Sequence, residues 1–265
     1  MVFCFSHYSD AFGEVDNQSS SLEHLVPNTF YLAPSFRLYQ TLISQITDLQ
    51  SNGHYEPSLK VFSVMIMDKH PRYAEQFIKN FSELSKGSQR YLLSVLLTTG
   101  HDKVANELQN DFRVKPMSSH FVSPREVEAI EIKNETDLDC LWAAYFATGD
   151  MFFVKKIMKF ITHDDFEMMV GYEALNRAWM CDMMKQSGKS IKEHCPDLSD
   201  LVMATKERYP HSFHSVFQQS LCVSSAIWSM DSNIKQDKQL KSRLHALVDS
   251  HPNLNYWKKI QRMIK

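Results

Sequence analysis

The 265-residue sequence is 43% hydrophobic, with a formal net charge of -2 at pH 7 and a sequence pI near 6.6. A chain of this size can bury a substantial core without disulfides or a structural metal. The near-neutral charge excludes the strong positive field by which proteins bind nucleic acid or anionic membranes non-specifically. Seven glycines and nine prolines are few for a β-sandwich or barrel, so the composition favours helices.

Cysteine usage and hydropathy indicate a cellular compartment. The five cysteines lie at positions 4, 140, 181, 195 and 222, with no C-x-x-C spacing. An odd count without paired spacing is not typical of a disulfide framework, so we expect reduced thiols and a cytoplasmic protein. The start of the sequence lacks the basic segment and apolar run of a signal peptide. No stretch approaches the roughly 18 apolar residues that a membrane span needs.

The two ends of the chain differ in charge. Residues 1–36 contain no Lys or Arg, and residues 1–27 are polar, acidic and without a sustained period. We expect residues 1–27 to form a loosely ordered arm. From Lys235 onward, basic residues predominate. Such a surface can dock an acidic partner or phosphates, although a solvated helical face, covered or not by the acidic arm, is the commoner explanation.

Residues 28–265 are expected to form a single α-helical domain. Between Tyr39 and Leu49, apolar residues recur at spacings of three and four, which predicts an amphipathic helix ending near Asn52. Seven of the nine residues from Leu59 to Met67 are apolar. Periodicity cannot separate a buried helix from a buried strand there, but the residue types and helical neighbours favour a helix that ends before Pro71.

Further amphipathic stripes continue to the end of the chain. They run through 74–84, 92–97, 104–108, 138–146, 153–161, 168–183, 198–202, 213–228, 240–248 and 257–264. Residues 112–134 interrupt them, because two prolines and an alternating apolar pattern favour an irregular connection or a short extended piece. Thr136 is expected to open the next helix in a capping box with Asp139. The stripes predict an all-α fold of about 10–13 helices in antiparallel hairpins.

Two segments resemble each other. Residues 92–108 read LLSVLLTTGHDKVANEL and residues 141–157 read LWAAYFATGDMFFVKKI, which aligns Gly100 with Gly149. In both, a buried helix is expected to end at a glycine in the left-handed conformation, with an amphipathic helix following. Two copies are fewer than a repeat array needs, so a single irregular domain is favoured over a solenoid-like one.

Two motifs carry a resemblance to known sequences. They are DLDCLWAAYFATGD at 137–150 and AIWSMDSN at 226–233. The chain resembles a family of uncharacterised all-helical bacterial proteins, mainly proteobacterial, in which similar motifs occur. The second motif of the family reads WSL-x-SNA. This chain departs from it at Met230 and Ile234, both apolar replacements. The resemblance spans roughly residues 57–250 and implies no activity. With the missing signal peptide, it motivates the alternative of export into a host by a signal-independent route.

The polar residues of these motifs form our candidate ligand pocket. In the second motif, Ser229 and Ser232 are three residues apart and Asn233 follows one turn after Ser229, so they share a helix face. They could meet carboxylates of the first motif around a small ligand, or form a satisfied polar patch that ties helices together. The candidate residues are Asp137, Asp139, Trp142, Trp228, Ser229, Ser232 and Asn233.

The sequence gives little support for a metal site or a catalytic nucleophile. The candidate groups are His211 with His214, His194 and Cys195 with Cys181, His101 with Asp102, and His163 with Asp164 and Asp165. None has a recognised ligand spacing, and the His-Asp pairs follow helix-ending signals, where an early aspartate favours the next helix. No nucleophile elbow or glycine-rich phosphate loop is present. Cys195, beside His194 and near Lys192, is the one candidate reactive thiol.

These observations favour a non-catalytic interaction or scaffold protein with no cofactor. We expect an unidentified protein partner, no specific nucleic acid and no membrane span. A homodimer formed through an exposed helical stripe is a further alternative. The rival functions are a small-ligand-binding helical domain and a metal-dependent phosphohydrolase that would use converging His and Asp residues.

Overall fold

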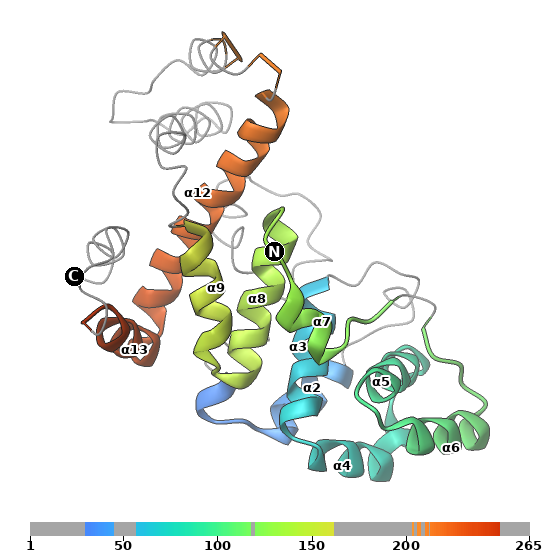
Figure 1. Cartoon of the computed structure of the whole chain (residues 1–265). Coiled ribbons are helices and arrows are strands. Elements are labelled where there is room, and N and C mark those ends of the chain that lie inside the picture. The colour runs from blue at the N-terminus through green and yellow to red at the C-terminus, as the bar shows by residue number, and fades with distance from the viewer. Residues whose placement is uncertain are drawn as a thin grey trace, which may run out of the picture. The chain divides into compact units, whose positions relative to one another are not determined.

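The computed structural model describes residues 30–44, 57–117, 120–161 and 213–249, together with 203, 206–207 and 210–211 (Figure 1). Every regular element in these ranges is a helix, which confirms the all-α prediction. None of these helices is both long enough and apolar enough to cross a membrane. The predicted arm, residues 1–27, and the stripes at 168–183, 198–202 and 257–264 lie outside the described residues.

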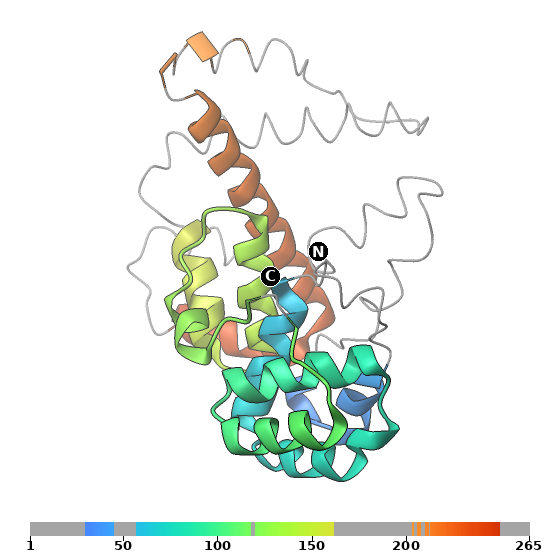
Figure 2. The ribbon, with the colours of Figure 1, turned by 90° about the vertical axis from the view of Figure 1, so that its right-hand side faces the viewer.

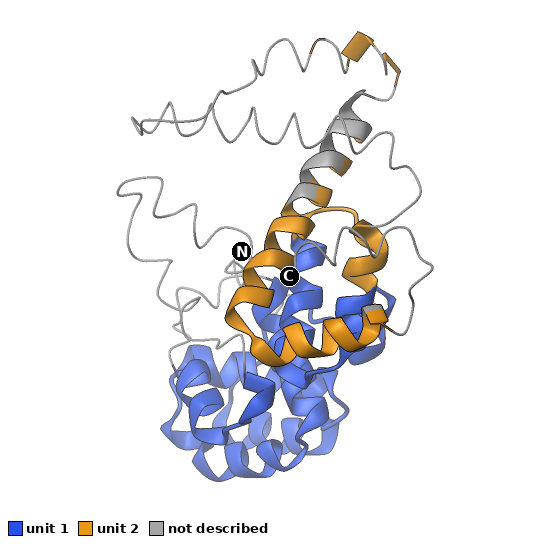
Figure 3. Ribbon diagram, turned by 90° about the vertical axis from the view of Figure 1, so that its left-hand side faces the viewer, with its two compact units in different colours: residues 1, 17–131, 136–155 blue, residues 2–16, 132–135, 156–265 orange. Residues whose placement is uncertain are grey.

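The chain divides into two compact units, coloured separately in Figure 3. Unit 1 contains the described residues through 131 together with 136–155. Unit 2 contains 132–135 and the described residues from 156 onward, so the division falls within helix α9 (Met151–Ile161). The single domain expected over 28–265 remains a prediction.

Unit 1 is built from short helices that follow one another closely in the chain (Figures 1 and 2). Two 3-10 turns, η2 and η4, accompany the α-helices. In chain order the elements are η2 (Phe30–Leu32), α2 (Phe36–Ser44), α3 (Pro57–Lys69), α4 (Arg72–Asn80), η4 (Phe81–Glu83), α5 (Lys86–Thr98), α6 (Asp102–Phe112), α7 (Pro124–Ala129) and α8 (Glu135–Thr148).

Helix α3 is buried on every side. It begins at Pro57, a position where the missing amide costs no helical hydrogen bond, and it ends at Lys69 before Pro71, as predicted. All residues from Lys60 to Met67 are buried, so no face of that stretch meets water. It contacts both α5 and α7. The apolar run at 59–67 is therefore a core helix, whose all-round burial explains why its sequence shows no amphipathic period.

Two tyrosines from other helices form hydrogen bonds with α3. The hydroxyl of Tyr91, from α5, lies 3.0 Å from both the Leu59 carbonyl oxygen and Ser63 Oγ. The hydroxyl of Tyr39, from α2, donates to the Ser63 carbonyl oxygen at 3.3 Å. Burial raises the pKa of Tyr39 well above its usual range, so this phenol stays protonated and can donate. Each buried hydroxyl thus has a partner on the helix that it packs against.

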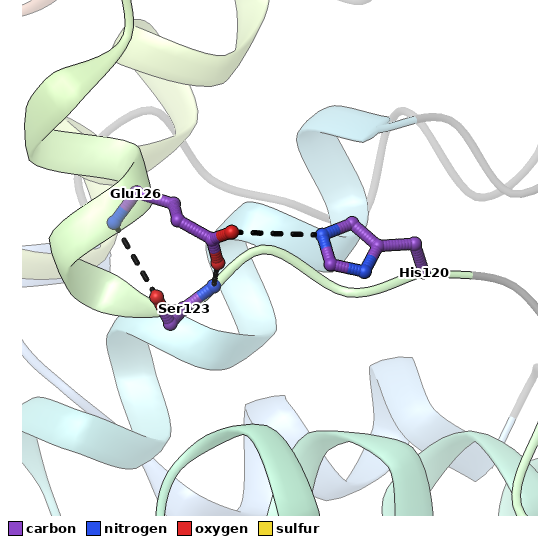
Figure 4. Close-up of polar contacts among 3 residues, drawn as sticks. All are labelled: His120, Ser123 and Glu126. Carbon is purple, nitrogen blue, oxygen red and sulfur yellow. Dashed lines mark hydrogen bonds and ion pairs between the residues drawn. The ribbon is translucent and has the colours of Figure 1, made fainter.

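The connection at 112–134 contains a helix that the sequence analysis did not predict. We expected an irregular or extended segment, but Pro124–Ala129 forms α7. Ser123 Oγ accepts the Glu126 amide at 3.4 Å, and Glu126 Oε2 accepts the Ser123 amide at 2.6 Å (Figure 4). This reciprocal capping box, with a proline in the first turn, outweighs the alternating apolar pattern.

The capping box predicted at Thr136 is wrong. Helix α8 already begins at Glu135, so Thr136 lies inside its first turn rather than at its N-cap. Asp139 is 5% exposed and belongs to the packed part of the helix. The Thr-x-x-Asp pattern has the right residue types, but the helix starts before it.

The described part of unit 2 contains the remainder of α9 and the helices α12 (Phe213–Gln236) and α13 (Lys238–Asp249), which pack against each other. Asp237 separates them and is 1% exposed. Its Oδ1 accepts the amides of Gln239 and Leu240, each at 2.9 Å. This carboxylate caps the start of α13, where it also complements the helix dipole.

The two aligned glycines both end helices in the left-handed conformation, as predicted. Gly100 has φ +79° and Gly149 has φ +68°. After α5, the His101 amide donates to the Leu96 carbonyl oxygen at 2.9 Å and the Gly100 amide to that of Leu97 at 3.4 Å, the two bonds of a Schellman motif. After α8, the next helix follows at once, and its N-terminus is capped by Asp150, whose Oδ1 accepts the Phe152 amide at 2.8 Å.

The surroundings of the two glycines differ. A Cβ atom on Gly100 would meet nothing within 4 Å, whereas one on Gly149 would lie 2.4 Å from Cδ2 of Tyr31. The Tyr31 ring covers Gly149, and its hydroxyl lies 2.8 Å from that of Tyr145. Gly149 therefore meets two requirements, a positive φ and a close approach by an aromatic ring.

This difference predicts unequal effects of alanine at the two positions. We expect Gly100→Ala to lower the free energy of unfolding by about 1–2 kcal/mol, the usual cost of a left-handed residue with a Cβ. We expect Gly149→Ala to cost a further 1–3 kcal/mol or so, because the Tyr31 ring must move. Denaturant unfolding of both variants measures the difference.

Removing the ring provides the control. In a Tyr31→Ala background, Gly149→Ala should cost only about as much as Gly100→Ala does in the natural sequence. Equal costs for the two glycine variants in the natural sequence would show that the Tyr31 contact contributes nothing to stability.

Candidate functional site

The seven candidate pocket residues lie on two helices in different units. Asp137, Asp139 and Trp142 belong to α8 in unit 1. Trp228, Ser229, Ser232 and Asn233 belong to α12 in unit 2. A pocket formed by both groups together remains a prediction.

The α8 group is mostly core. Trp142 is fully buried, with its ring stacked on Phe146 at a centroid distance of 5.7 Å. Asp139 is 5% exposed and Asp137 is half-buried. Burial, followed by the charges of Asp139 and Asp137, raises the pKa of the neighbouring Cys140 thiol to about 12. Cys140 is therefore an unreactive core thiol, and Trp142 is a packing residue rather than an exposed ligand platform.

The α12 group uses part of its hydrogen-bonding capacity within its own helix. Ser229 is fully buried, and its Oγ donates to the Ala226 carbonyl oxygen at 3.0 Å. Ser232 Oγ accepts Gln236 Nε2 at 3.2 Å, in a more exposed position. Trp228 is half-buried. A serine hydroxyl that bonds back to its own helix is satisfied without a ligand.

Asn233 differs from the other polar residues of α12. It is 3% exposed, and its Nδ2 meets no hydrogen-bond acceptor among the described residues. A buried amide donor without an acceptor costs free energy, because it has lost its bonds to water. Of the four α12 candidates, Asn233 is the one with a buried donor that meets no acceptor in the described part of the chain.

The metal-site hypothesis gains no cluster from the described part of the chain. Within it, no three His, Cys, Asp or Glu side chains lie close enough together to hold a metal ion. Asp102 occupies the first turn of α6 directly after His101, as expected for a residue that favours the helix start. His211 is exposed. The remaining candidates, His163, Asp164, Asp165, Cys181, His194, Cys195 and the His214 side chain, lie outside the described residues.

Sequence analysis missed the polar residues around α3. It treated 59–67 as an apolar core segment and did not single out Lys60, Ser63 or Tyr91. The available signal was a lysine and a serine inside a run of otherwise apolar residues. A lysine at such a position can pack its aliphatic stem against apolar neighbours while its ammonium reaches the surface.

No family model matches this chain, and neither a curated protein nor a solved structure shows significant similarity to it. The resemblance to a bacterial family therefore depends on the two motifs alone. Functional inference must start from the residues themselves.

The buried Nδ2 donor of Asn233, which meets no described acceptor, leads to a stability prediction. We expect Asn233→Leu to leave the free energy of unfolding unchanged within about 1 kcal/mol, or to raise it, because no described acceptor loses a bond. Thermal or denaturant unfolding measures this, with Ser229→Ala as a neighbouring control. A loss of more than about 2 kcal/mol would mean that the Asn233 amide is bonded in the folded protein.

Proposed function

We propose that this chain is a non-catalytic interaction protein that binds a protein partner through an apolar surface of unit 1. Large apolar side chains are rarely exposed in the described residues: the exceptions are Leu32 at 41%, Phe152 at 44% and Met203 at 58%. Two of these three belong to adjoining segments of unit 1, which singles out one region of the surface. This clustering is the observation that supports the proposal.

The contact between Tyr31 and Gly149 brings the two segments together. Leu32 follows Tyr31 directly, and Phe152 lies in the first turn of α9, three residues after Gly149. Ala33 and Pro34, next to Leu32, are exposed as well. We call these four residues, Leu32, Ala33, Pro34 and Phe152, the strap surface.

The strap surface is held rigidly enough to serve in recognition. Phe30 is buried and packs edge-on against Phe62 of α3, with ring centroids 5.5 Å apart. Tyr31 is fixed by Gly149 and Tyr145. The exposed side chains at 32–34 therefore directly follow two residues held by packing contacts, and a partner would lose little chain entropy on binding them.

The cysteine environment supports a reducing compartment for this function. Cys140 and Cys222 are both buried. Buried cysteines of this kind act as small apolar residues, which suits the cytoplasmic location that we propose.

A small-ligand-binding function is the second candidate, and Asn233 favours it. Its unused Nδ2 donor would suit a ligand that presents a carbonyl or other acceptor. A small molecule that co-purifies with the natural protein, and is absent from Asn233→Leu, would support this candidate over the first.

The interaction proposal predicts that Phe152→Asp weakens partner binding about 10-fold or more, because a charge replaces an apolar anchor at the contact. The full-length tagged protein is purified from the cells that naturally make it, and bound proteins are quantified by mass spectrometry. Met203→Asp is the matched control, since it changes an exposed apolar residue of unit 2 in the same way.

The proposal requires a protein that binds the natural sequence and Met203→Asp but not Phe152→Asp. If that protein is a second copy of the chain, the strap surface is a homodimer interface. Binding that is unchanged by Phe152→Asp would overturn the role of this surface.

A further inference from the structure

The outer face of α9 continues the strap surface with positive charge. Phe152 lies in the first turn of this helix, and Lys155, Lys156 and Lys159 follow at spacings that keep all four residues on one side. Phe152, Lys155 and Lys159 are exposed, and Lys156 is half-buried. The three lysines are the only charged residues of α9, and we call them the lysine row.

The opposite face of α9 belongs to the core. Its members are all buried: Phe153, Val154, Ile157, Met158 and Ile161. A helix that lies on a membrane places its apolar face among the lipid headgroups and acyl chains. The apolar face of α9 already packs in the protein interior, and Phe152 is the only large apolar residue of this helix that is exposed. The arrangement therefore favours a protein partner over an anionic membrane.

The other segment of the strap surface carries the same sign of charge. Arg37, three residues after Pro34, is exposed and is the only charged residue in the described stretch 30–44. Among the described residues, neither Arg37 nor Lys155 pairs with a carboxylate. The carboxylate of Asp150 accepts the Phe152 amide at the start of α9. Both segments of the strap surface are therefore followed in the chain by an exposed, unpaired cation.

We propose that the partner of the strap surface presents an acidic segment, whose apolar side chains contact the strap surface and whose Asp or Glu carboxylates pair with the lysine row, beginning at Lys155. This inference rests on the proposed interaction function and specifies the chemistry of the partner. From Phe152 to Lys159 the helix rises about 10 Å, so a segment of a few residues can make both kinds of contact. Complementary charges of this kind select and orient a partner more than they add affinity.

A library of random peptides tests the chemistry of the partner. The peptides are displayed on phage, selected on the immobilised full chain and counter-selected on Phe152→Ser, which removes the ring without adding charge. We expect the surviving peptides to combine apolar residues with an excess of Asp and Glu over Lys and Arg. Survivors without that excess would overturn the acidic partner and leave the strap surface as a binding site. The absence of survivors would count against both proposals.

The lysine row is then tested with a synthetic copy of the most enriched peptide, by fluorescence anisotropy. Lys155→Glu should weaken binding about 5-fold and Lys155→Gln about 2-fold, the size expected for one exposed ion pair. The matched control is Lys103→Glu, which reverses an exposed lysine of α6 and should leave binding unchanged. Added salt should weaken binding to the natural sequence more than binding to Lys155→Gln.

Two results with these variants would overturn the proposal. If Lys155→Glu and Lys103→Glu bind the peptide equally well, the position of the positive charge on α9 does not matter. If the full chain sediments with vesicles that contain phosphatidylserine but not with phosphatidylcholine vesicles, and Lys155→Glu abolishes this, the lysine row binds an anionic membrane instead.

Discussion

The burial of α3 on all sides is the constraint on which unit 1 depends. A helix without a solvent-facing side cannot contain a polar group unless its neighbours provide a partner or a path to water. Tyr39 and Tyr91 meet this requirement by placing hydroxyls on the α3 backbone and on Ser63. The same bonds link α2 and α5 to α3, so the buried hydroxyls of both tyrosines are satisfied by this helix.

The position of the strap surface can be traced to a contact with this helix. Phe30 packs on Phe62 of α3 and thereby positions the strap surface, while Tyr31 next to it covers Gly149. The proposed protein contact thus depends on the enclosed helix beneath it.

Periodicity predicted most of the described helices, because an amphipathic stripe records which side of a helix is buried. It failed at α7, where a six-residue helix depends on the Ser123 and Glu126 cap rather than on a stripe. The start of α8 was misplaced for another reason, because the Thr136–Asp139 spacing resembles a capping box although the helix already begins at Glu135. The candidate site was harder to predict from the sequence than the helices were. The burial of Trp142 and the unmatched donor of Asn233 depend on how the chain packs, which spacing along a helix does not show. Spacing along a helix shows a shared face, but not what that face meets.

Native-state hydrogen exchange of unit 1 tests the central role of α3 most directly. If α3 is an enclosed core helix of the unit, its amides from Lys60 to Met67 should exchange only when the whole unit unfolds. Together with those of the equally buried stretch Leu138–Ala147 of α8, they should be the slowest to exchange. Their apparent free energies of opening should then match the global value measured by denaturant. Exchange of α3 through local openings, at rates similar to those of the more exposed α4 and α6, would contradict this account.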